Sequence, residues 1–293
     1  MREKVCKMFT ERDACPVPAP GRHSVGSMKR LNDRVVLVTG AARGMGRSHC
    51  ERVADEGADV IALDLEHHAD ELAVTSGEVV ARSRRCVTGF ADVRDPRTLA
   101  DLVAEGVARL GRIDAVVANA GVYPNAQPSW ELDETQWRTT LDVNLTGIWN
   151  TVRAAHPYLR AGGSVVLVSS TNGVKGSPGT SHYCASKHGV IGLGQTLANE
   201  LGNQGIRVNT VLPGSVGTSM ILNDNVFGKL CPDLDEPGIE HAAAVLATRT
   251  LLDVAWVDPV DVSNAVVFLL SDEARYITGI NVPVDAGLLA RTS

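Results

Sequence analysis

The sequence is poor in the features that mark several classes of protein. Aromatic residues make up only 4% of the 293 residues, which argues against a module that binds nucleic acid by stacking bases on aromatic rings. The longest strongly apolar run, residues 265–270, is far shorter than the roughly 20 residues that cross a bilayer. Positive charge is scarce as well, because 28 Lys and Arg against 34 Asp and Glu leave a net charge of −6. We therefore expect neither a nucleic-acid partner nor a membrane partner.

Cysteine usage gives no metal or disulfide signature. The six cysteines stand at positions 6, 15, 50, 86, 184 and 231; no two form Cys-x-x-Cys, and no histidine cluster keeps metal-ligand spacing. Residues 1–30 carry seven Lys and Arg against three Asp and Glu, with no apolar stretch of the kind found in a secretory signal. We predict no metal site, reduced thiols, a disordered N-terminal extension over residues 1–30 and a cytoplasmic location.

The rest of the chain alternates short apolar runs with helical segments. Val-Val-Leu-Val-Thr at residues 35–39 is typical of a strand buried on both faces. Further strands are expected at 60–64, 86–91, 113–118, 164–169, 207–212 and 281–284. Helices are expected at 44–56, 67–82, 97–110, 134–159, 181–202 and 260–270, with a less regular helical stretch over 217–256. This order predicts one domain over residues 31–289, a Rossmann-type doubly wound parallel sheet in a three-layer α/β/α sandwich.

A glycine-rich turn follows the first expected strand. Thr39-Gly-Ala-Ala-Arg-Gly44-Met-Gly46 opens the next helix, so a pyrophosphate is able to approach the backbone at the helix N-terminus. Its Gly-x-x-x-Gly-x-Gly spacing differs from the usual Gly-x-Gly-x-x-Gly pattern, and a purely structural turn explains it about equally well. The preceding strand, the following helix and an acid at the expected distance favour a dinucleotide site.

That acid is Asp64, at the end of the second expected strand. A carboxylate there accepts hydrogen bonds from the adenosine ribose hydroxyls and repels a 2′-phosphate, so it predicts NAD rather than NADP. Arg43 in the turn favours the opposite, because a cation is able to pair with that phosphate. We give Asp64 more weight because its position opposes the phosphate directly. A helix N-cap is the structural alternative for Asp64.

Two further strand ends are expected to contact the cofactor. Asp92 and Val93 follow the third strand, where they are placed at the adenine edge. Asn119, Ala120 and Gly121 follow the fourth strand, with small residues where the backbone has to approach a ligand.

A second group of residues indicates proton-transfer chemistry. Tyr183 and Lys187 are four residues apart in a predicted helix, so they share a face, and the ammonium is expected to lower the pKa of the phenol. Such a phenol suits proton exchange with an alcohol near neutral pH. Ser170 is placed to hold the substrate oxygen, and Asn144 is expected to bend its helix and hold a water. The Tyr/Lys pair alone often arises by chance on a surface, but its combination with the other motifs argues against chance.

Together these residues resemble the short-chain dehydrogenase/reductase family over residues 31–287. The matching motifs are Thr39-Gly-x-x-x-Gly-x-Gly46, Asp64, Asn119-Ala-Gly121, Asn144, Ser170, Tyr183-x-x-x-Lys187 and Pro213-Gly-Ser-Val-Gly-Thr218. The resemblance implies that Tyr183 is the acid/base and that Lys187 lowers its pKa and binds the nicotinamide ribose. It also implies that Ser170 orients the carbonyl and that Asn144 anchors a water of a proton relay.

The resemblance further implies the binding residues and the assembly. The expected cofactor-binding residues are Gly40, Arg43, Gly44, Met45, Gly46, Asp64, Leu65, Asp92, Val93, Asn119, Ala120, Gly121, Tyr183, Lys187, Pro213, Gly214, Val216 and Thr218. The expected substrate-binding residues are Ser170, Asn172, Tyr183, Ser215 and Met220, under a lid over residues 217–256. A homotetramer is implied, with the helices around 134–159 and 181–202 at the subunit interface.

A narrower resemblance is to the mycofactocin-associated, carveol-dehydrogenase-like subgroup. It rests on Gly-Ala-Ala-Arg-Gly-Met-Gly-Arg-Ser-His49, His182-Tyr-Cys-Ala-Ser-Lys-His-Gly-Val190, Cys231-Pro-Asp-Leu-Asp-Glu-Pro-Gly238, Trp256-Val-Asp-Pro-Val-Asp-Val-Ser-Asn-Ala265 and Ser271-Asp-Glu-Ala-Arg-Tyr-Ile-Thr-Gly279. The subgroup oxidises small alcohols, terpenoid ones included. The chain departs from it because Asp64 and Asp92 are only 28 positions apart, which leaves no room for its usual insertion, and because Pro213-Gly214 follows the general family.

The sequence thus predicts an NAD(H)-dependent oxidoreductase that interconverts a small hydrophobic secondary alcohol and its ketone. A reductase of 3-oxoacyl thioesters shares the same site and is the first alternative. A non-catalytic NAD-binding sensor or scaffold is an alternative of another class. The intact set of Tyr183, Lys187, Ser170 and Asn144 disfavours it, because a protein without turnover has no need of that set.

Overall fold

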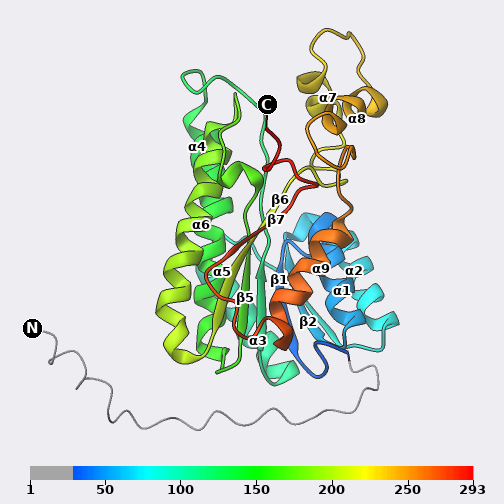
Figure 1. Cartoon of the computed structure of the whole chain (residues 1–293). Helices are drawn as coiled ribbons and strands as arrows, with labels where there is room; N and C mark the ends of the chain where they lie inside the picture. Colours follow the sequence, from blue (N-terminus) through cyan, green and yellow to red (C-terminus); the bar gives the residue numbers. More distant parts are fainter. Residues whose placement is uncertain (1–28, 293) are drawn as a thin grey trace, which may run out of the picture.

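The computed structural model describes residues 29–292, so most of the expected N-terminal extension lies outside the described residues. Seven strands form one parallel sheet in the order β3-β2-β1-β4-β5-β6-β7 (Figure 1). The strands are β1 (Val35–Thr39), β2 (Asp59–Asp64), β3 (Cys86–Phe90), β4 (Ala115–Ala118), β5 (Ser164–Val168), β6 (Arg207–Pro213) and β7 (Asn281–Val284). The helices are α1 (Gly44–Asp55), α2 (Ala69–Ala81), α3 (Pro96–Leu110), α4 (Glu134–Leu141), α5 (Gly147–Ala155), α6 (Ser181–Leu201), α7 (Asp224–Leu230), α8 (Ile239–Ala247) and α9 (Pro259–Leu270). The predicted doubly wound α/β fold is confirmed.

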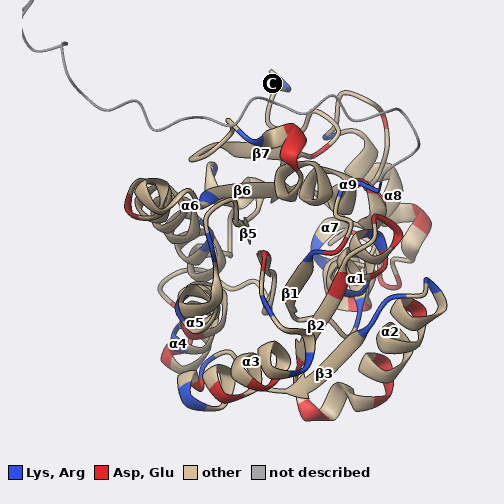
Figure 2. Ribbon diagram, turned by 90° about the horizontal axis from the view of Figure 1, so that it is seen from below, with Lys and Arg blue, Asp and Glu red and all other residues tan. Residues whose placement is uncertain are grey.

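Two hydrophobic cores, one on each face of the sheet, hold the three layers together. Successive strand residues point to opposite faces, so Val36 and Val38 of β1 pack with α1, α2 and α9, whereas Val35 and Leu37 pack with α3, α5 and α6. Figure 2 shows these two helical layers on either side of the sheet. Burying one such side chain contributes about 1.5–3 kcal/mol, which explains why the strands read as continuous apolar runs.

The strand order reverses beside β1, and this reversal positions the site. Strand β1 pairs with β2 on one side and with β4 on the other. The connections that leave β1 and β4 therefore diverge to opposite faces and open a crevice at the carboxyl ends of these strands. The glycine-rich turn and Asn119-Ala120-Gly121 both begin at this crevice.

The single helix predicted over residues 134–159 is wrong in detail. The structure divides it into α4, a π-helical turn over Asp142–Thr146, α5 and a 3₁₀ turn over His156–Tyr158. The π turn closes with a hydrogen bond from the Gly147 N–H to the Asp142 carbonyl, which places one extra residue in the turn. Asn144, the residue expected to bend the helix, lies in the middle of this turn.

Residues 217–256, the expected lid, contain two short helices. Helices α7 and α8 pack against each other and stand together above the rest of the molecule in Figure 1. The Asn223 side chain caps α7 by accepting a hydrogen bond from the Val226 N–H at 3.1 Å. The remainder of the segment is turns, as its irregular pattern predicted.

Three features are absent from residues 29–292. No helix there is both long enough and apolar enough to cross a membrane. No group of three or more His, Cys, Asp or Glu side chains in this part of the chain is arranged to hold a metal ion. The four cysteines within it, Cys50, Cys86, Cys184 and Cys231, are not paired in disulfides.

A buried histidine between α1 and α9 makes the stability of the fold sensitive to acid. The Nδ1 of His49 lies 2.8 Å from the Ser263 hydroxyl, its Nε2 has no partner in the described residues, and burial lowers its pKa to about 3. Between pH 3 and 6.5 the unfolded chain therefore binds the extra proton, so stability falls as the pH drops through this range. His182, whose pKa is also lowered by burial, acts in the same direction.

We expect the free energy of unfolding to fall below pH 6.5 with a slope of up to ~1.4 kcal/mol per pH unit from His49. In His49→Asn, which keeps a polar atom near Ser263 but does not titrate, the slope between pH 6.5 and 5 should flatten. Denaturant unfolding at several pH values measures it. The exposed-site control, His67→Asn, should keep the wild-type slope, and an unchanged slope in His49→Asn contradicts the assignment.

Candidate active site

The glycine-rich turn between β1 and α1 is too tight for larger residues. Gly40 and Gly44 have φ angles of +66° and +54°, in the left-handed region that favours glycine. At Gly46 a Cβ atom would lie 1.8 Å from the Gly40 carbonyl oxygen. The turn thus packs backbone against backbone and leaves the first N–H groups of α1 free of intrahelical partners, as an anion site requires.

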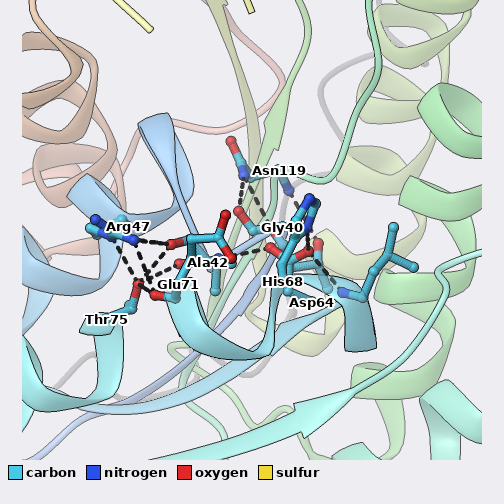
Figure 3. Close-up of polar contacts among 11 residues, drawn as sticks. Gly40, Ala42, Arg47, Asp64, His68, Glu71, Thr75 and Asn119 are labelled. Carbon is cyan, nitrogen blue, oxygen red and sulfur yellow. Dashed lines mark hydrogen bonds and ion pairs between the residues drawn. The ribbon is translucent and has the colours of Figure 1, made fainter. Parts of the chain in front are cut away.

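Side chains from three other elements hold this turn in place (Figure 3). The Asn119 amide donates to the carbonyl oxygens of Thr39 at 3.0 Å and Gly40 at 3.2 Å. The Arg47 guanidinium donates to the Ala42 carbonyl at 2.7 Å and contacts the Thr75 hydroxyl. The side-chain amide of Asn119 is thus occupied by the turn itself. The predicted contact of Asn119 with the cofactor stays a prediction.

Asp64 ends β2 with a buried carboxylate. One oxygen accepts a hydrogen bond from the Ala42 N–H at 2.7 Å, and the other accepts from the Leu65 N–H at 2.8 Å. The Nδ1 of His68 lies 2.9 Å from the same second oxygen. His68 was not among the predicted site residues, although its spacing of four residues from Asp64 is a local signal. The carboxylate therefore links β2 to the glycine-rich turn.

A cavity of about 590 Å³ opens above this turn. Every cofactor-binding residue predicted between Gly40 and Gly121 lines it. His68 and Arg94 line it too, and Arg94 pairs with the Asp92 carboxylate at 2.6 Å. The cavity size falls in the range of small-molecule sites.

Tyr183 and Lys187 occupy the first turns of α6, on one face. The Lys187 ammonium is buried and donates to the Val168 carbonyl at 2.9 Å; burial lowers its pKa to about 8. Burial raises the pKa of the Tyr183 phenol to about 12, and a hydrogen bond with Ser170 opposes this rise. The expected lowering of the phenol pKa by Lys187 is therefore not met: desolvation is the largest cause of the shift, and the Lys187 ammonium, 5.7 Å from the ring centroid, is not among its causes.

Asn144 is fully buried and its amide is used by protein groups. Its Oδ1 accepts from the Val122 N–H at 2.7 Å, and its Nδ2 donates to the Val122 carbonyl at 2.9 Å and to the Ser186 hydroxyl at 3.2 Å. A Cβ on Gly121 would lie 3.3 Å from this Oδ1 and 3.5 Å from the Lys187 Nζ. The side chain thus ties the loop after β4 to α6, beside Lys187. Its water-binding role stays a prediction.

A second cavity, of about 300 Å³, lies between Tyr183 and the lid. All the predicted substrate-binding residues line it, and so do Pro213, Gly214 and Val216, which were expected on the cofactor side. The residues common to both cavities are Met45, Tyr123, Thr218 and Met220. The two cavities therefore adjoin, whereas the side chains of Asn144 and Lys187 lie buried behind their walls.

Sequence reasoning missed one tyrosine and three cations of the second cavity. The Tyr123 ring stands edge-on to Tyr183 with centroids 4.8 Å apart, and its hydroxyl lies 3.1 Å from the Lys229 ammonium of α7. Lys175 and Arg249 line the same cavity. No local motif marks any of the four, because they come from separate loops and helices that only the fold brings together.

Comparison with known proteins places this site in a family. A family model described as enoyl-(acyl carrier protein) reductase matches residues 40–289. The chain is 44% identical to a putative short-chain type dehydrogenase/reductase of Mycolicibacterium smegmatis and 44% identical to (−)-trans-carveol dehydrogenase of Rhodococcus erythropolis; each match covers 89% of this chain and 99% of the relative. The crystal structure of carveol dehydrogenase from Mycobacterium avium in complex with NAD superposes with a TM-score of 0.88 at 46% identity, covering 90% of this chain and 100% of that one. The chain belongs to the short-chain dehydrogenase/reductase family of oxidoreductases.

Proposed function

We propose that the protein is an NAD-dependent dehydrogenase/reductase that interconverts a hydrophobic secondary alcohol and its ketone. The observation that carries this proposal is the junction of the two cavities, where the Tyr183 phenol and the Ser170 hydroxyl face a space that continues into the crevice above the glycine-rich turn. The relative from Rhodococcus erythropolis, a carveol dehydrogenase, and the NAD complex of the Mycobacterium avium protein support it.

The residues of the larger cavity fit a dinucleotide. Gly46 leaves no room for a Cβ beneath the turn, so the turn is able to bring N–H groups close to a pyrophosphate. The Asp64 carboxylate stands at the cavity wall, where it would hold the adenosine ribose. Lys187, which lies behind the wall with its ammonium on the Val168 carbonyl, would hold the nicotinamide ribose. When bound, NAD supplies or accepts the hydride.

The protein's own groups manage the proton and the substrate oxygen. A phenol with a pKa of about 12 is protonated at neutral pH, so Tyr183 is ready to deliver its Oη proton to a carbonyl oxygen in the reductive direction. In the oxidative direction the ionised form of Tyr183, the phenolate, takes up the hydroxyl proton of the alcohol. Ser170 holds the same oxygen through its hydroxyl. Asn144 acts as a positioning residue through Val122 and Ser186.

The walls of the smaller cavity favour an apolar substrate body. Ile221, Val226, Leu230 and Leu246 of the lid segment line it. The test is a panel of secondary alcohols scored by NAD reduction, run with and without an artificial electron acceptor. Reduction of NAD identifies a dehydrogenase with exchangeable cofactor, and turnover only with the acceptor indicates retained cofactor. Absence of turnover with every alcohol and every ketone contradicts the proposal and favours the non-catalytic alternative.

The cofactor preference provides a prediction about Asp64. Wild-type protein should bind NADH more tightly than NADPH, because the buried carboxylate repels a 2′-phosphate. Asp64→Asn should lower the ratio of the two affinities about tenfold, by loss of a charge effect of ~1.4 kcal/mol. Fluorescence titration with both reduced cofactors measures the ratio. Asp92→Asn is the matched control in the same cavity, since its carboxylate is already paired with Arg94. Tighter NADPH binding by the wild-type protein contradicts the argument.

We also propose a homotetramer and a cytoplasmic location. Exposed tryptophans on residues 134–159, one of the two segments expected at the interface, support the tetramer, since Trp137 of α4 is 37% exposed and Trp149 of α5 is 43% exposed. Light scattering should give four times the chain mass of 31.1 kDa.

A further inference from the structure

The smaller cavity carries charge of one sign. Lys175, Lys229 and Arg249 line it, and among residues 29–292 no Asp or Glu does. The three cations come from separate places: the loop before α6, helix α7 and the turn after α8. All three are exposed, and they line the cavity together with apolar residues that include Ile221 and Leu230.

The positive charge around the smaller cavity does not follow from the composition of the lid segment, residues 217–256. Residues 217–256 contain six acids, Asp224, Asp233, Asp235, Glu236, Glu240 and Asp253, and only two cations, Lys229 and Arg249. Both cations line the cavity and none of the six acids does. An acidic segment thus presents a basic inner surface toward Tyr183.

These cations lack the carboxylate partners that several other cations of the protein have. Arg30, Arg82 and Arg94 each lie within 3 Å of a carboxylate oxygen. Within the described residues, neither Lys175 nor Arg249 forms an ion pair, and the Lys229 ammonium has the Tyr123 hydroxyl as its contact. None of the three lines the dinucleotide cavity, so a phosphate of the cofactor does not account for them.

We propose that the substrate is an anion: a secondary alcohol or ketone whose apolar body ends in a carboxylate or a phosphate ester, which Lys175, Lys229 and Arg249 bind at the mouth of the cavity. The proposal rests on the proposed function and narrows its substrate class. The guanidinium of Arg249 offers a planar pair of donors to either anion, and the lysines add point charges. The apolar walls hold the body, and Tyr183 and Ser170 hold the oxygen at the other end.

The test compares acids with their own methyl esters. The probes are 5-hydroxyhexanoate, 7-hydroxyoctanoate and 9-hydroxydecanoate, which place the secondary alcohol at increasing distances from the carboxylate, and the three methyl esters. A further pair of probes, 3-hydroxyoctanoyl-CoA and the methyl ester of 3-hydroxyoctanoate, distinguishes a phosphate-bearing substrate from a free acid. We expect kcat/KM with NAD to favour at least one acid over its ester by tenfold or more, or to favour the CoA thioester over the methyl ester of 3-hydroxyoctanoate. The preference should weaken as salt is added.

Variants connect the preference to the named residues. The double variant Lys175→Gln/Arg249→Gln should bring the acid-to-ester ratio close to one. Arg160→Gln removes one positive charge at the amino ends of the strands, just before β5, and should leave the ratio unchanged. Lys229 is left unchanged in these variants because its ammonium also contacts the Tyr123 hydroxyl.

Failure of this proposal differs from failure of the proposed function. Turnover of the esters at rates equal to or above those of the acids and the thioester, at every chain length, overturns the anionic substrate and leaves the dehydrogenase standing. Absence of any turnover overturns the dehydrogenase. Calorimetric titration of the NADH-loaded protein with the matching keto acids and keto esters then decides the anion preference by binding alone; tighter binding of the acid supports it and equal binding overturns it.

Discussion

Tyr183→Phe is expected to lower kcat for alcohol oxidation by about 10²–10⁴-fold, the usual contribution of a positioned acid or base. The substitution removes one hydroxyl from the floor of the substrate cavity and keeps the ring that stands edge-on to Tyr123. The packing and the dinucleotide cavity are therefore preserved. NADH affinity, measured by fluorescence titration, should stay within a factor of about two, which separates lost chemistry from lost binding.

The pH profile gives the same prediction a second readout. With a phenol pKa of about 12, the ionised fraction rises tenfold with each pH unit below that value, so oxidation by the wild-type protein should accelerate through the alkaline range. The variant should lose this rise. Tyr158→Phe is the control. Tyr158 packs against the core just before β5, at the amino ends of the strands, whereas the site lies at their carboxyl ends. Near-wild-type turnover in Tyr183→Phe would falsify the assignment of Tyr183 as the acid/base.

Gly46→Ala is expected to weaken NADH binding by more than tenfold and to lower the free energy of unfolding by about 1–3 kcal/mol. The added Cβ would stand 1.8 Å from the Gly40 carbonyl oxygen and 2.9 Å from the Asn119 amide nitrogen, so the backbone of the turn has to move. Moving it displaces the N–H groups expected to hold the pyrophosphate. Denaturant unfolding and NADH titration measure the two effects separately.

Gly77→Ala is the matched control for this substitution. Gly77 lies within α2, and a Cβ there meets nothing within 4 Å. Alanine in a helix restricts the unfolded chain more than glycine does, so this variant should be unchanged or more stable by about 0.4–1 kcal/mol, with unaltered NADH affinity. Wild-type affinity in Gly46→Ala would show that the turn does not hold the cofactor.

Much of the fold was predictable because each strand is a short, continuous apolar run. Strand β1 and strand β7 begin and end where the sequence analysis placed them, and the other elements differ by about two residues at most, with the exception of residues 134–159. That exception has a physical reason. The carbonyl and N–H of Val122 pair with the side chain of Asn144, and the π turn that presents this side chain depends on a partner 22 positions away in the sequence.

The site was predictable where its chemistry is encoded locally. The glycine-rich turn, Asp64 and the Tyr183/Lys187 pair each depend on spacing within a few residues of a strand end or helix start, so their motifs are visible in one dimension. The roles of these residues stay predictions until the variants are measured. His68 next to Asp64 had only a weak local signal, and Tyr123 next to Tyr183 had none.

The order of apolar runs and turns was sufficient to determine a doubly wound sheet with a dinucleotide site, since buried strands and a tight glycine turn follow from local residue chemistry. Tertiary structure alone decided the electrostatics. It placed Tyr183 where desolvation raises its pKa, although Lys187 stands four residues further along the same helix. It also turned Lys229 and Arg249 of an acidic lid toward the substrate cavity, where Lys175 joins them. Burial and long-range convergence depend on how distant segments pack, and no local pattern records that.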